Sequence, residues 1–177
     1  SGHGQKKTFR ADGSSDYLDL VKKLPFMKNS DIASNMQRAS KAEHRFYGED
    51  LMKIVQKLTD LPDSMSMIPL SQLVNSLSIY DDKDEAVVHL IEVITKKVRK
   101  SEVILNSQAV GNMLYSLQGM SSDCPEVRAL LRELPRLVKT CTEPLTAQIV
   151  GNMLYGLQGM KSDCPEVRAL LRELPRL

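Results

Sequence analysis

The chain has 177 residues, of which 42% are apolar and 26% charged, and its formal net charge at neutral pH is only +2. This composition excludes a strongly basic arm and a chain too polar to fold, and no apolar run approaches the roughly 18 residues of a membrane span, so we expect a soluble protein. Trp is absent and the cysteines number three, which disfavours an aromatic-rich β-sandwich and a disulfide framework, and favours a reducing compartment.

The first segments of the chain are expected to precede the main body. Residues 1–15 are polar and predict a disordered tail or a remnant of a cloning sequence, while 16–29 predict an extra N-terminal helix, with an apolar pattern in Tyr17 to Leu24. The rest of the chain divides into four units that repeat with a period of 37 to 40 residues. Their expected bounds are 30–68, 69–104, 105–144 and a truncated 145–177.

An internal repeat supports this division. Residues 108–137 and 148–177 differ at only three of thirty positions, namely 109/149, 116/156 and 121/161. An asparagine in the same slot of each unit extends the period to the earlier, more divergent units. These asparagines are Asn35, Asn75, Asn112 and Asn152. A period of this length is typical of stacked helical arrays.

The first half of each unit predicts an amphipathic helix. In the last unit Val150, Leu154 and Leu157 fall at positions i, i+4 and i+7, which is the spacing of one helix face. We expect this helix to end at Gly159, because glycine readily adopts the left-handed conformation that closes a helix. We call it the A helix of its unit.

The second half predicts another helix, the B helix. A cap at Ser162 or Asp163, Pro165 in the first turn and a regular apolar face from Val167 onward are a strong start signal. Prolines late in these helices, Pro135 and Pro175, should kink or end them. Two such helices cannot each bury an apolar face alone, so we expect an all-α protein, an α-solenoid of about four helix-turn-helix repeats.

The A-helix motif points to a family. Residues 146–160, with a small residue before the asparagine and Leu-aromatic-small-Leu after it, resemble the octotricopeptide repeat and the related heptatricopeptide and FAST-kinase-like repeats. The resemblance implies a mitochondrial or plastid protein that binds RNA in transcript stabilisation, processing, translation or ribosome assembly. Tyr115 and Tyr155 stand where tryptophan is common, and no segment resembles a RAP domain. The tetratricopeptide pattern is absent, whereas a HEAT-like array stays an alternative.

The repeated asparagines have two interpretations. An amide could pair with a base edge of RNA, but a residue that is constant across units cannot discriminate between bases. A buried amide that bridges backbone groups would also recur, and we favour this structural role.

Positions that flank the asparagines on the same helix stripe are better candidates for RNA contacts. They vary between units while the centre stays fixed, as expected of side chains that read or stack on bases. For the tyrosines, packing between units is an equally good interpretation. The candidates are Asp31, Arg38, Ser71, Ser78, Gln108, Tyr115, Gln148 and Tyr155, together with Asn112 and Asn152.

Positive charge is the remaining requirement for RNA. The densest cluster ends the second B helix, and its members are candidate phosphate contacts or simply cations at a helix C-terminus. They are Lys96, Lys97, Arg99 and Lys100. Arg128, Arg132 and Arg136 recur forty residues later, but interspersed glutamates favour a solvated outer face.

Catalysis finds no support in the sequence. His3, His44 and His89 are scattered, and Cys124 and Cys164, at identical repeat positions, are interpreted as turn residues. We therefore expect no enzyme activity, no metal, no cofactor, no small-molecule substrate and no membrane association. The expected partner is single-stranded RNA or rRNA. The alternative is a protein-interaction scaffold such as a subunit of an organellar ribosome, which the near-neutral charge favours.

Overall fold

The computed structural model describes residues 16–174, and every regular element in that range is helical. The expectation of an all-α protein is thereby confirmed for these residues. The expected tail at 1–15 and Pro175 lie outside them. The α-helices are α1 (Leu20–Lys23), α2 (Asn29–Lys41), α3 (Gly48–Asp60), α4 (Met67–Asn75), α5 (Glu85–Lys100), α6 (Ser107–Tyr115), α7 (Pro125–Val138), α8 (Ala147–Gly156) and α9 (Pro165–Glu173). Short 3₁₀ turns add η1 (Tyr17–Asp19), η2 (Leu24–Phe26) and η3 (Ser76–Ile79).

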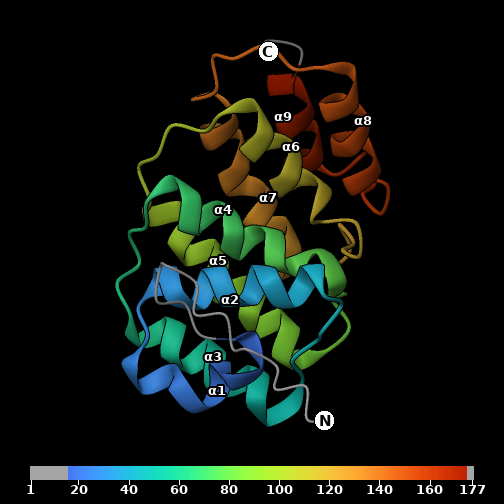
Figure 1. The fold of residues 1–177 in the computed structure, drawn as a ribbon. Helices are drawn as coiled ribbons and strands as arrows, with labels where there is room; N and C mark the ends of the chain where they lie inside the picture. The colour runs from blue at the N-terminus through green and yellow to red at the C-terminus, as the bar shows by residue number, and fades with distance from the viewer. Residues whose placement is uncertain (1–15, 175–177) are drawn as a thin grey trace, which may run out of the picture.

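The helices form two layers because the chain alternates between them. From α2 onward each helix packs against the helix two places along, so α2, α4, α6 and α8 make one layer. The second layer contains α3, α5, α7 and α9. Figure 1 shows this order rising from the N-terminal helices to α8 and α9 at the opposite end. The short segment from η1 to η2 packs on α2 and α3 at the N-terminal end.

The apolar faces of both layers meet in one continuous core. The face predicted from Val167 onward, and its copy from Val127, is buried: Leu130, Leu131 and Leu170 are almost completely enclosed. Each amphipathic helix hides its apolar stripe only because neighbouring helices cover it. The core therefore runs along the array without a single centre.

Helix starts follow the local signals in the sequence. The Asn106 and Thr146 side chains accept hydrogen bonds from the backbone N–H groups of Ala109 and Ile149, which caps α6 and α8. Pro165 opens α9 as expected, but the cap position is Cys164, and neither Ser162 nor Asp163 occupies it. Pro165 at the first helical position has no N–H, so it removes one of the groups that would lack a partner within the helix.

The prediction that the last A helix ends at Gly159 is wrong, and Pro135 does not end its helix. The helix α8 ends at Gly156, and Gly48 is the only described glycine with positive φ, so Gly159 does not close a helix in the left-handed conformation. A Cβ at Gly159 would instead overlap the backbone oxygen of Met120, so close approach explains this glycine. The helix α7 continues through Pro135 to Val138, because burial of its last turn outweighs the missing hydrogen bond.

Candidate functional site

The predicted contact stripe is best formed on α6 and α8. Gln108 and Gln148 are exposed, and Gln108 Nε2 donates to Asn112 Oδ1 at 3.0 Å. The rings of Tyr115 and Tyr155 stack with centroids 5.6 Å apart and planes inclined by 22°. The structure therefore brings the candidate side chains of two helices together, and the tyrosines both contact each other and keep an exposed edge.

On α2 the central asparagine of the stripe is enclosed, while the candidates Asp31 and Arg38 on either side are half-buried. Asn35 is completely buried, its Nδ2 donates to the Asp31 backbone oxygen at 2.8 Å, and its Oδ1 accepts from Arg38 at 2.9 Å. This is the bridging arrangement expected of a structural amide, and it leaves Asn35 no free edge for a base.

The α4 stripe is intermediate between the two. Ser71 is buried, and Asn75 and Ser78 are half-buried. The Oδ1 atom of Asn75 is enclosed without a hydrogen-bond partner. Asn152 is likewise half-buried, on the helix at the exposed end of the layer. The repeated asparagines therefore differ in their hydrogen bonding, and only Asn35 among them is fully buried.

Because their environments differ, replacing these asparagines by alanine should lower the free energy of unfolding by different amounts. Asn35→Ala should lower the free energy of unfolding by about 1–2 kcal/mol, since it leaves the Asp31 carbonyl and the Arg38 guanidinium short of a partner. Asn152→Ala is the matched control and should change it by less than about 0.5 kcal/mol. Urea unfolding of both variants checks this. Equal losses would show that the asparagines play one common structural role.

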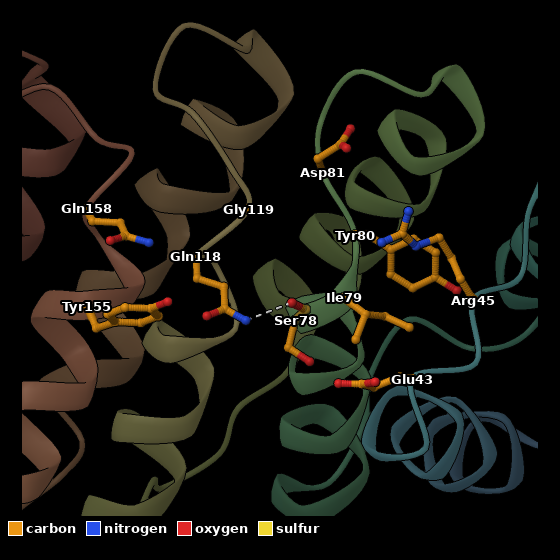
Figure 2. Close-up of a pocket in the computed structure, with 10 residues that line it drawn as sticks. All are labelled: Glu43, Arg45, Ser78, Ile79, Tyr80, Asp81, Gln118, Gly119, Tyr155 and Gln158. Carbon is orange, nitrogen blue, oxygen red and sulfur yellow. Dashed lines mark hydrogen bonds between the residues drawn. The ribbon is translucent and has the colours of Figure 1, made fainter.

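An open groove of about 720 Å³ lies beside the stripe, where the chain leaves the helices of the first layer. Two stripe residues, Ser78 and Tyr155, reach into it, so the groove continues the candidate surface. Figure 2 shows its walls rising from loops of successive helix pairs. It is lined by Glu43, Arg45, Ser78, Ile79, Tyr80, Asp81, Gln118, Gly119, Tyr155 and Gln158.

Amides and one cation give the groove its chemistry. Gln118 Nε2 donates to the Ser78 backbone oxygen at 2.9 Å, while its counterpart Gln158 is exposed. Arg45 lies 5.9 Å from the centre of the Tyr80 ring. The Tyr80 hydroxyl accepts from the Phe46 N–H at 2.9 Å, and burial raises the pKa of Tyr80. The acids Glu43 and Asp81 outnumber Arg45, so the groove has a formal charge of −1, and it offers hydrogen-bonding groups and the exposed ring of Tyr155.

Four groove residues, Arg45, Tyr80, Gln118 and Gln158, are not among the candidates predicted from the sequence. Gln118 and Gln158 each follow a repeat asparagine by six residues, so the duplication contained a usable signal. Arg45 and Tyr80 come from the divergent units and had no such signal. Their position depends on how successive loops are placed, which periodicity does not reveal.

The structure changes the role of Lys97. Its side chain is fully buried, and Nζ donates to the backbone oxygens of Leu61 and Pro62, at 3.4 and 3.0 Å, just beyond α3. Burial lowers the pKa of Lys97, Asp63 opposes that shift, and Lys96 adds to it. Lys97 therefore caps a neighbouring helix and is removed from the phosphate-contact candidates. Lys96, Arg99 and Lys100 remain exposed.

Arginines in the second layer connect successive helices. Arg99 pairs with Glu133 across α5 and α7, and Arg132 pairs with Glu166 across α7 and α9, both at 2.9 Å. Arg136 donates to backbone oxygens at the end of α5, including that of Val98 at 2.8 Å. Much of the basic row predicted to be solvated thus joins one helix to the next.

Because of Glu166, the free energy of unfolding should depend on pH in the acid range. Hydrogen bonds from the Cys164 thiol and from Arg132 lower its pKa from 4.5 to about 2. Because the folded-state pKa is depressed, this stabilisation is present above the unfolded pKa and is lost as pH falls from about 4.5 to about 2. Glu166→Gln should therefore flatten the acid limb of unfolding curves measured across that range. An unchanged pH dependence would contradict this assignment.

The other titratable groups form no reaction centre in the part of the chain that the structure describes. His44 packs between Tyr17 and Phe46, and His89 lies beside Glu85 and Glu92. Burial raises the pKa of the Cys124 thiol. Residues 16–174 contain no group of His, Cys, Asp and Glu side chains that could hold a metal ion, and none of their helices is long and apolar enough to cross a membrane.

Comparison with known proteins adds no relative. No family model matches the chain, and no curated protein or solved structure matches it significantly. The resemblance to octotricopeptide repeats consequently rests on the motif at 146–160 and on the period of the units.

Proposed function

We propose that this chain is an RNA-binding α-solenoid of the octotricopeptide type, built from the four units 30–68, 69–104, 105–144 and 145–177. It holds single-stranded RNA or rRNA without catalysing a reaction. Its setting is organellar gene expression, in a mitochondrion or alternatively a plastid, where it acts in transcript stabilisation, processing, translation or ribosome assembly. The alternation of two helical layers is consistent with this proposal.

The stacked tyrosine pair is the observation that carries the proposal. Tyr115 and Tyr155 present ring surface on neighbouring helices, and each shares its stripe with an exposed glutamine seven residues earlier, Gln108 or Gln148. Aromatic rings stack on unpaired bases of any type, and amides pair with base edges. The groove extends these contacts with Gln118, Gln158 and Arg45.

This chemistry suits single strands rather than duplexes. Stacking requires bases that are already unpaired, and the groove combines one arginine with two acids. Several basic groups that phosphates would need are engaged elsewhere, in ion pairs or as helix caps. Binding should therefore depend on bases more than on phosphates, with a shallow dependence on salt.

The test measures binding of a labelled random-sequence single-stranded RNA pool by fluorescence anisotropy at low and moderate salt. Replacing Tyr115 and Tyr155 together by Ala should weaken binding at least tenfold, since stacking contributes about 1–3 kcal/mol per base. Tyr47→Ala is the control, because Tyr47 is an exposed tyrosine that precedes α3 in the other layer. The proposal fails if no RNA is retained at low salt, or if the double variant binds like the control.

The second candidate function is a protein-interaction scaffold, for instance a subunit of an organellar ribosome. The engagement of Lys97, Arg99, Arg132 and Arg136 within the fold favours it, because few cations are left to attract a polyanion. A steep loss of RNA binding with modest salt would argue against this candidate.

A further inference from the structure

The last helix of the first layer exposes an apolar face that its duplicate buries. Val150 and Leu154 of α8 are 40% and 57% exposed. The identical positions on α6, Val110 and Leu114, are each 1% exposed. Because the residues are the same, the difference comes from the neighbour: α8 covers the face of α6, and no described element covers that of α8.

The glycines of α6 and α8 show the same difference in packing. A Cβ at Gly111 would lie 2.9 Å from Ile149 Cγ2, so this glycine receives the isoleucine of α8. A Cβ at Gly156 would overlap the Leu114 backbone, so this second glycine lets α8 approach α6 closely. Gly151, the counterpart of Gly111, has no atom within 4 Å of the Cβ position. Gly151 on α8 therefore offers the same space for a side chain as Gly111 on α6, but no described atom occupies it.

The second layer shows the same difference between copies at an arginine. Arg132 of α7 pairs with Glu166 of α9, which is the second residue of its helix. Arg172 occupies the position of Arg132 one copy later and is exposed, and no acid within residues 16–174 pairs with it. The end of the array therefore presents an exposed apolar stripe on α8 in the first layer and an exposed cation on α9 in the second.

We propose that this end face, formed by Val150, Gly151, Leu154 and Arg172, binds a helical hairpin of the same repeat type. Its first helix carries a β-branched residue at the position of Ile149 and a glycine or other small residue at that of Gly156. Its second helix begins with an acid at the position of Glu166. These requirements are read from the way α8 and α9 cover α6 and α7 in the same chain.

A folded second copy does not supply such a hairpin. Its own Gly156 is already packed on α6, and the matching residues of α2, Ile32 and Ala39, are buried beneath neighbouring elements. The occupant is therefore a hairpin whose packing face is still free. This proposal concerns the end of the layers and does not depend on RNA binding.

The test uses a polypeptide of sequence 138–177 as the probe and the full chain as the receptor. Isothermal titration calorimetry should show saturable one-to-one binding. Leu154→Lys in the receptor should weaken it at least tenfold while leaving the melting temperature unchanged, because this side chain is exposed. Gly156→Val in the probe should have a similar effect, since the added side chain overlaps the receptor backbone.

A charge exchange distinguishes this register from nonspecific apolar association. Arg172→Glu in the receptor should weaken binding, and Glu166→Lys in the probe should restore it. Because an isolated hairpin folds only on binding, the same segment is also fused to the end of the full chain, where hydrogen exchange should show added protection of the α8 amides.

Three results would overturn the proposal. The first is a lack of both probe binding and α8 protection, and the second is binding that Leu154→Lys leaves intact. The third is concentration-dependent dimerisation of the chain alone that Leu154→Lys abolishes, since the occupant would then be a second copy. RNA binding by the Leu154→Lys variant is measured in parallel, so that failure here remains separate from failure of the proposed function.

Discussion

Replacing Gly156 by Ala is expected to lower the free energy of unfolding by about 3 kcal/mol. At this position α8 and α6 meet backbone to backbone, and a Cβ would overlap the Leu114 carbonyl group and the Tyr115 Cα. Neither partner is the end of a flexible side chain, so relief requires the two helices to separate. Separation would also pull Ile149 away from Gly111. Urea unfolding followed by circular dichroism measures the loss.

Gly151→Ala is the matched control for this prediction. Gly151 lies in the same helix, with nothing near its Cβ position, so the substitution removes backbone freedom without a clash. It should raise stability by about 0.5–1 kcal/mol. If both substitutions changed stability in the same direction, close approach of the two helices would not be the reason for Gly156.

The helix pairs themselves could be predicted from the sequence, because each depends on local signals. The apolar spacing of Val150 and Leu154 and the proline of Pro165 specify helices whatever lies beside them. What packs against each helix could not be predicted in the same way. Val110 and Val150 occupy equivalent positions of two nearly identical segments and have opposite exposure, because only α6 has a following described helix on its face.

The two differences between the duplicated A helices show how packing modifies a repeat. Ala109 of α6 and Ser116, the residue that follows α6, become Ile149 and Gly156 of α8. The structure pairs these changes: Ile149 reaches into the space above Gly111, and Gly156 removes the side chain that would keep the helices apart. Comparison of the two copies locates these substitutions, but only the contact between α6 and α8 explains them.

The candidate site was predicted in part for the same reason. The stripe on α6 and α8 exists as side-chain neighbours, since helical periodicity alone fixes which residues share a face. Asn35 has the buried, bridging role that we favour for the repeated asparagines, through hydrogen bonds with Asp31 and Arg38 of its own helix. Lys97 differs from expectation because its environment is set by residues that are distant in sequence, Leu61 and Pro62 beyond α3. A cation cluster at a helix end therefore does not reveal which member faces solvent.

Lys97→Ala is expected to lower the free energy of unfolding by about 3 kcal/mol. The change leaves the backbone oxygens of Leu61 and Pro62 without their cationic donor and removes the buried aliphatic stem that packs between α3 and α5. Burial lowers the pKa of this lysine, so the fold bears a desolvation cost, which these contacts and the nearby Asp63 carboxylate offset. Thermal and urea unfolding measure the effect.

Lys96→Ala provides the control, because Lys96 is adjacent, exposed and paired only at the surface with Asp63 at 3.6 Å. Its loss should change stability by less than about 0.5 kcal/mol. The two variants also separate structure from binding. If Lys97 caps α3, Lys97→Ala should reduce RNA affinity only as far as it unfolds the chain, whereas direct loss of RNA affinity in a fully folded Lys97→Ala protein would restore the phosphate-contact role.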